Sequence, residues 1–174
     1  ISFGTLWYNM QTDQTWIYNR YQAGNIFEVF AYADVAKDLE GVRLPQKGQQ
    51  NWKSAEMRQL GINQMNYMLG VNPWDVSFMP GVGDKNDAHP HHRASNPEGK
   101  NMPGAAYVYN PPVGALFGGV TPGDINAWAP STMSWEDYHL SETCIDGTAM
   151  FLAAGAMATR AEDLGRAPKD VNVE

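Results

Sequence analysis

One run of apolar residues, MFLAAGAMA from Met150 to Ala158, limits the fold more than any other feature. A helix built from it is apolar nearly all round, and such a helix is buried on every side. We predict that it begins between Ser134 and Ser141 and runs to about Leu164. A chain of 174 residues with three good helices cannot surround it. We therefore expect this chain to be part of a larger body.

Two further helices are predicted upstream. The first is capped by Asn25 and ends near Leu39, and the second begins near Asn51 or Ser54 and ends before the C-cap glycine Gly70. Between them and the last helix, residues 70–134 contain no convincing helix. Apolar residues recur at helical spacing in both predicted helices: Ile26, Val29, Phe30, Ala33 and Ala36 in the first, and Met57, Leu60, Met65, Met68 and Leu69 in the second.

Charge and length exclude several classes of protein. The chain has 12 basic and 19 acidic residues and a net charge of -7, which opposes binding to nucleic acid or to an anionic membrane surface. No apolar run approaches the roughly 20 residues of a membrane-spanning helix. The single cysteine, Cys144, excludes an internal disulfide. Ile1 stands where an initiator Met would be, which we interpret as an internal start.

Residues 81–95, GVGDKNDAHPHHRAS, form a polar loop with chemically active side chains, and we consider three interpretations. Loops that carry such residues are often functional. In the first interpretation His89, His91 and His92, with Asp87, bind a metal, but H-x-H-H is not a common zinc spacing. In the second, the histidines only pin the loop to backbone carbonyls.

The third interpretation is a ligand site. His91 and Arg93 are two apart, so in an extended segment they point the same way. An imidazole and a guanidinium offer fixed hydrogen-bonding partners to sugar hydroxyls. The chain also has six Trp and eight Tyr, whose flat apolar faces and polar tips suit sugar rings, although most of them are expected in the core. We expect this loop to face residues 135–149 across a sugar-binding cleft.

Glu142 follows Ser141, a good N-cap residue. A helix N-terminus favours an ionised carboxylate, whereas a general acid needs a raised pKa from apolar surroundings. Spacing alone favours an ordinary first-turn glutamate that stabilises the helix. Cys144 with His139 could indicate a thiol nucleophile, but no cysteine hydrolase motif surrounds them.

Four segments together resemble glycoside hydrolase family 9, the cellulase family with an (α/α)6 barrel. They are YMLGVNPW (67–74), SFMPGVGDKNDAHPHHR (77–93), PPVGALFGGVTPGD (111–124), and Tyr138 with Ser141, Glu142 and Asp146. They occur in the order of the family, and the resemblance spans roughly residues 57–158. It implies an all-α fold, namely the last three or four helices of the barrel, with residues 1–174 forming the C-terminal part of a single catalytic domain.

The resemblance also implies roles for individual residues. Glu142 aligns with the proton donor, and His91, Arg93 and Tyr138 with residues that contact sugar. Met133 and Thr148 depart from the usual Asp and Asn of the second signature. The D-A-G-D-type motif that carries the catalytic base is absent from this sequence, so we expect the base in an N-terminal part of the domain outside this chain.

The implied function is hydrolysis of β-1,4-glucosidic bonds with inversion, as in an endoglucanase. The expected partners are a β-glucan polysaccharide or oligosaccharide and the N-terminal part of the same domain, without nucleic acid or membrane, in a secreted or cell-surface location. No cofactor is required for the chemistry; the resemblance allows a structural calcium in the whole domain, at no site defined here. The alternatives are a non-catalytic carbohydrate-binding or scaffold fragment, and a metal-binding module.

Overall fold

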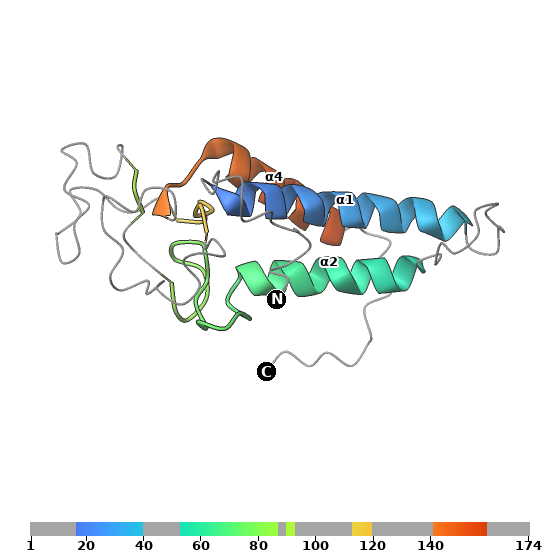
Figure 1. Cartoon of the computed structure of the whole chain (residues 1–174), viewed down its shortest axis with the longest axis horizontal. Coiled ribbons are helices and arrows are strands. Elements are labelled where there is room, and N and C mark those ends of the chain that lie inside the picture. Colours follow the sequence, from blue (N-terminus) through green and yellow to red (C-terminus); the bar gives the residue numbers. More distant parts are fainter. Residues whose placement is uncertain (1–16, 40–52, 87–89, 93–112, 120–140, 160–174) are drawn as a thin grey trace, which may run out of the picture.

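The computed structural model describes residues 17–39, 53–86, 90–92, 113–119 and 141–159. The regular elements in these ranges are three α-helices, α1 (Tyr18–Leu39), α2 (Ser54–Met68) and α4 (Ile145–Ala158). Helix α1 packs against both α2 and α4, which touch each other much less. In Figure 1, α1 and α4 run in the same direction and α2 runs in the opposite one. The start of α1, the end of α2 and the start of α4 therefore lie at the same end of the group.

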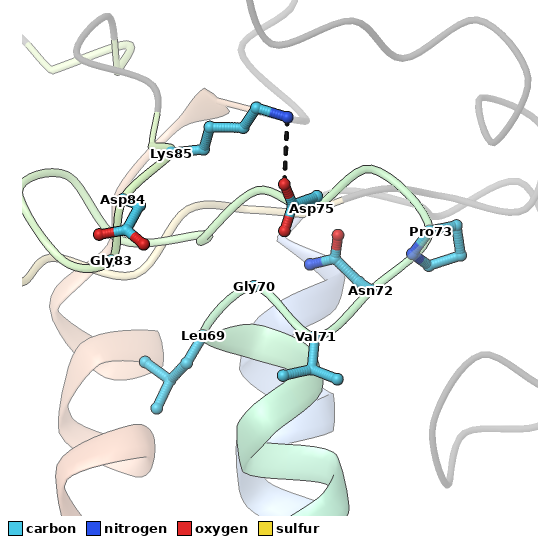
Figure 2. Close-up of a pocket in the computed structure, with 9 residues that line it drawn as sticks. All are labelled: Leu69, Gly70, Val71, Asn72, Pro73, Asp75, Gly83, Asp84 and Lys85. Atoms are coloured by element: carbon cyan, nitrogen blue, oxygen red, sulfur yellow. Dashed lines mark hydrogen bonds and ion pairs between the residues drawn. The ribbon is translucent and has the colours of Figure 1, made fainter. Parts of the chain in front are cut away.

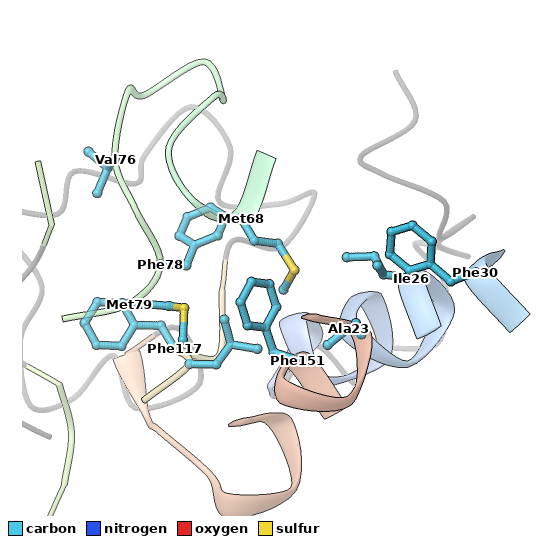
Figure 3. Close-up of a cluster of buried hydrophobic side chains, with 11 residues drawn as sticks. Ala23, Ile26, Phe30, Met68, Val76, Phe78, Met79, Phe117 and Phe151 are labelled. Atoms are coloured by element: carbon cyan, nitrogen blue, oxygen red, sulfur yellow. The ribbon is translucent and has the colours of Figure 1, made fainter. Parts of the chain in front are cut away.

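The buried apolar cluster joins the three helices to the loops at this end (Figure 3). Its helical members are Ala23, Ile26 and Phe30 of α1, Met68 of α2, and Phe151 and Ala154 of α4; its loop members are Val76, Phe78, Met79, Leu116 and Phe117. Burying one large apolar side chain contributes about 1.5–3 kcal/mol. The loops are therefore part of the core and are held by it.

Helix α1 ends at Leu39 as predicted, but it begins at Tyr18, so the predicted start at Asn25 is wrong. The turn that was missed has two buried amide side chains, Asn19 and Gln22, with 2% and 1% of their surface exposed. The backbone N–H of Asn19 donates to the carbonyl of Gly118 over 2.7 Å. A search for apolar periodicity misses a turn whose buried side chains are polar and whose backbone is hydrogen-bonded to a distant loop.

Helix α2 begins at Ser54, within the predicted range, and its C-cap is Leu69. Gly70 follows with φ +123°, a conformation that glycine adopts without strain, so the predicted C-cap glycine is present. Only Gly61 and Met68 of this helix are buried. The rest of its predicted apolar stripe is half-buried at most in the described part of the chain.

Helix α4 begins at Ile145 with Cys144 as its N-cap, later than predicted, and its C-cap is Thr159; the predicted end at Leu164 lies outside the described residues. Within the described residues the helix is not buried on every side, because Ile145 and Leu152 are 89% and 73% exposed. Its covered side carries Phe151 and Ala154. In the described ranges, no helix combines the length and the apolar character needed to cross a membrane.

Candidate active site

The loop that leaves α2 is organised by the side chain of Asn72. Its Nδ2 donates to the carbonyls of Tyr67 and Val76 over 2.8 and 2.7 Å. Its Oδ1 accepts the backbone N–H groups of Trp74 and Val76 over 3.2 and 3.3 Å. One asparagine thus satisfies four backbone groups in a turn without regular structure. The turn returns the chain to the end of α2, where the N–H of Phe78 donates to the carbonyl of Met68 over 2.9 Å.

A second closed loop follows, and Ser77 and Asn86 pair across its base in a parallel β-bridge. The Oδ1 of Asn86 accepts the N–H of Gly81 over 2.7 Å, and its Nδ2 donates to the carbonyl of Gly83 over 3.1 Å. These bonds fix the point from which the chain continues towards His91.

Residues 113–119 connect this loop to the segment that precedes α4. The N–H of Phe117 donates to the carbonyl of Phe78, and that of Gly114 donates to the carbonyl of Pro80, each over 2.9 Å. Phe117 also forms an antiparallel β-bridge with Thr143, immediately after Glu142. A continuous series of backbone contacts therefore runs from the end of α2 to the segment that carries Glu142.

His91 and Glu142 lie side by side in a parallel β-bridge, and the N–H of His91 donates to the carbonyl of Ser141 over 3.2 Å. Pro90 and Ser141 are buried, whereas His91 and Glu142 are half-buried. Paired residues of neighbouring strands project to the same face. The structure thus places the backbones of His91 and Glu142 next to each other, with both residues partly exposed. An imidazole and a carboxylate are groups that can transfer a proton and hold hydroxyl groups.

The other predicted site residues, Arg93 and Tyr138, lie outside the described residues. Glu142 itself precedes the N-cap Cys144, so it is not a first-turn glutamate of α4. The predicted place of Glu142 in the first turn of the last helix is therefore wrong. Sequence spacing missed this because the residues after Ser141 form bridges with distant segments instead of continuing into α4.

An ion pair joins Arg20 of α1 to Asp146 in the first turn of α4. The Nη1 of Arg20 donates to the Oδ2 of Asp146 over 2.8 Å, and its Nη2 donates to the hydroxyl of Tyr21 over 2.6 Å. The hydrogen bond from Arg20 lowers the pKa of Asp146, which is therefore ionised at neutral pH. Sequence patterns did not single out Arg20, because its partner is far away in the chain.

Cys144 lies in the same surroundings. Burial, and then the charges of Glu142 and Asp146, raise the pKa of its thiol to about 11, with Arg20 opposing them. A thiol with that pKa is almost entirely protonated at neutral pH, and only the thiolate is a good nucleophile. The interpretation as a thiol nucleophile therefore finds no support.

An open pocket of about 750 Å³ lies between the turn after α2 and the second loop (Figure 2). It is lined by Leu69, Gly70, Val71, Asn72, Pro73, Asp75, Gly83, Asp84 and Lys85. At its rim Lys85 Nζ and Asp75 Oδ2 form an exposed ion pair at 3.1 Å. Neither His91 nor Glu142 lines the pocket, so we do not assign the candidate chemistry to it.

The structure does not bring together a metal site in the part of the chain that it describes, where no group of three or more His, Cys, Asp or Glu side chains is placed to hold an ion. His89 and Asp87, which the metal interpretation needs, lie outside the described residues.

A family model for glycosyl hydrolase family 9 matches residues 2–155. The chain belongs to this family. It is similar to endoglucanase A of Bacillus pumilus, with 32% identity over 138 residues that make up 76% of this chain and 18% of the relative. It is also similar to endoglucanase B of Cellulomonas fimi, with 30% identity over 155 residues, 88% of this chain and 13% of the relative. The chain thus spans less than a fifth of these curated relatives.

Solved family 9 structures have a similar fold. The crystal structure of endoglucanase CelQ from Clostridium thermocellum complexed with cellotriose matches with a TM-score of 0.60 and 26% identity, over 83% of this chain and 21% of that one. The cellulase Cel9M of C. cellulolyticum matches in fold with a TM-score of 0.55 and 24% identity, over 83% of this chain and 29% of that one. As predicted, the chain has the fold of part of an (α/α)6 barrel.

Proposed function

We propose that the protein containing this chain hydrolyses β-1,4 bonds of a glucan with inversion, and that Glu142 is the proton donor. The observation that carries the proposal is the β-bridge between His91 and Glu142, which joins two segments far apart in the sequence. Family membership and the similarity to endoglucanases support the substrate class. The crystal complex of CelQ with cellotriose supports a cello-oligosaccharide as the ligand.

In this proposal Glu142 gives its proton to the glycosidic oxygen as the bond from that oxygen to the anomeric carbon breaks. A water molecule attacks the opposite face of the anomeric carbon, and a second carboxylate takes the proton of that water. In inverting enzymes the two carboxylates are about 6.5–9.5 Å apart, which leaves room for the water. We expect the second carboxylate outside this chain. His91, with Arg93 and Tyr138, would hold the sugar on either side of the bond.

We further propose that residues 1–174 act as the C-terminal part of one catalytic domain and are inactive alone. The small share of each relative that the chain covers supports this, since the rest of the domain would bring the base. The exposed apolar residues Ile145 and Leu152 of α4 support it as well. The expected partners are the rest of the domain and the glucan, without nucleic acid, in keeping with the net charge of -7.

The test is Glu142→Gln in the full-length protein, assayed on an unsubstituted cello-oligosaccharide. A general acid contributes about 10²–10⁴-fold, so kcat should fall by that factor while the oligosaccharide still binds. Glu28→Gln is the matched control, because Glu28 is exposed on α1 and should keep full activity. Near wild-type turnover in Glu142→Gln would contradict the assignment. Binding without hydrolysis in the unmutated protein would instead favour a carbohydrate-binding fragment.

A further inference from the structure

The hydroxyl of Thr148, in α4, has two partners. Its Oγ1 accepts the backbone N–H of Leu116 over 3.1 Å and donates to the carbonyl of Cys144 over 3.1 Å. The bond to Cys144 lies within one helical turn, whereas the bond from Leu116 comes from a distant segment. Leu116 is only 1% exposed. Buried backbone N–H groups need an acceptor, so this hydroxyl has a task that an apolar side chain cannot perform.

Leu116 and its neighbour Phe117 hold α4 and the candidate acid to the same short segment. The N–H of Leu116 is hydrogen-bonded to the hydroxyl of Thr148, and Phe117 forms a β-bridge with Thr143, the residue after Glu142. Phe117 is fully buried, and its N–H is bonded to the carbonyl of Phe78. Residues 113–119 are therefore attached to the backbone next to Glu142 at Thr143, and to α4 at Thr148.

We propose that Thr148 is a positioning residue that fixes Glu142 for proton transfer through Leu116 and Phe117. The inference rests on the proposed role of Glu142 as proton donor. In this proposal Thr148 acts indirectly: its hydroxyl sets where residues 113–119 lie against α4, and these residues set the place of Glu142. Small misplacements in an active site, of about 1 Å, lower the rate by about 10²-fold.

The informative variants are Thr148→Val, which keeps the shape and removes the hydroxyl, and Thr148→Ser, which keeps the hydroxyl. Thr159→Val is the matched control. Thr159 makes the same backward bond to a helix carbonyl, from its Oγ1 to Gly155 over 3.0 Å, at the exposed end of α4. Thr159→Val therefore removes the same kind of hydroxyl bond within α4 but leaves the hydrogen bond between Leu116 and Thr148 in place.

In the full-length protein, kcat of Thr148→Val on a cello-oligosaccharide should fall by about 10–100-fold, with KM within about twofold of wild type. On cellobiosyl fluoride, whose leaving group needs little protonation, the loss should be much smaller. Thr148→Ser should restore kcat, and Thr159→Val should match wild type. A merely structural role would lower both activities equally.

Equal losses on both substrates, or Thr148→Val behaving like Thr159→Val, would overturn the inference. If Thr148→Val does not fold, Thr148→Ala removes the same hydroxyl without a methyl group beside Leu116. Failure of both to fold would show a structural role alone and overturn it as well. Glu142→Gln separates this from the proposed function: full activity there contradicts the role of Glu142, whereas an inactive Glu142→Gln with a fully active Thr148→Val contradicts only the role of Thr148.

Discussion

The ring of Phe30 in α1 lies so close to Gly61 in α2 that there is no room for a Cβ atom on the glycine. A Cβ built there would be 2.7 Å from two ring atoms of Phe30. Phe30 is 1% exposed and belongs to the main core cluster, so its ring has little space into which to move. The close contact of α1 and α2 thus depends on a glycine in the middle of a helix, where glycine is otherwise unfavourable.

We therefore expect Gly61→Ala to destabilise the protein. Overpacking should cost about 1–3 kcal/mol, and the better helix propensity of alanine should offset about 1 kcal/mol of that cost. Gly24→Ala is the control, because a Cβ at Gly24, also inside a helix, meets no atom within 4 Å. That change should stabilise by about 0.5–1 kcal/mol. Chemical denaturation of both variants measures the two signs, and a stabilised Gly61→Ala would contradict the close contact.

The ends of the helices illustrate what the sequence could predict. Leu39, Ser54 and Gly70 were located by local signals, namely apolar periodicity and a C-cap glycine, and such signals need no knowledge of the rest of the fold. The starts of α1 and α4 were missed because each depends on a distant segment: Asn19 bonds to Gly118, and Thr143 pairs with Phe117.

The candidate site also has features that local sequence signals predict and features that depend on distant segments. Glu142 and His91 could be named from motifs, since each stands in a recognisable segment, and the structure places them next to each other. Thr148 was noticed only as a departure from the family pattern, and its bond to Leu116 could not be predicted. A hydroxyl in a helix shows nothing in the sequence about which backbone group will reach it from elsewhere.

The pair of Arg20 and Asp146 predicts a pH dependence of stability. The hydrogen bond from Arg20 lowers the pKa of Asp146 in the folded protein. The contribution of this pair to the stability of the fold is therefore complete above the unfolded pKa of Asp, about 3.9. It is lost as the pH falls through the lower pKa of Asp146 in the folded protein. Because the two side chains are 29% and 44% exposed, we expect at most about 1 kcal/mol.

Asp146→Asn should thus lower the melting temperature at pH 7, and its difference from wild type should shrink below about pH 4. Asp75→Asn is the control: it breaks the pair with Lys85, whose two side chains are far more exposed, and should change little at any pH. A difference for Asp146→Asn that grows as the pH falls would contradict the sign.

The exposed apolar residues of α4 predict that Leu152→Glu improves the behaviour of the isolated chain but destabilises the full-length protein. Ile145 and Leu152, two turns apart on the same face of α4, are 89% and 73% exposed, and exposed apolar patches drive association. The chain of 174 residues alone should therefore self-associate, and Leu152→Glu should reduce this in analytical ultracentrifugation. In the full-length protein the same change should lower stability, because the rest of the domain would cover this face.

Val71→Glu is the control for this reversal, since Val71 is equally exposed, at 75%, but lies on a loop. It should be tolerated in both contexts. A monodisperse chain that melts cooperatively, or a full-length Leu152→Glu of normal stability, would show that nothing covers α4.

The most direct test of Glu142 as the proton donor is the dependence of its loss on the leaving group. In full-length Glu142→Gln, kcat on a cello-oligosaccharide should fall by about 10²–10⁴-fold, because the departing sugar oxygen needs a proton. On cellobiosyl fluoride, which needs little protonation to leave, turnover should stay close to that of wild type. Equal losses on the two substrates would contradict the role of proton donor and show that Glu142 acts in binding or folding instead.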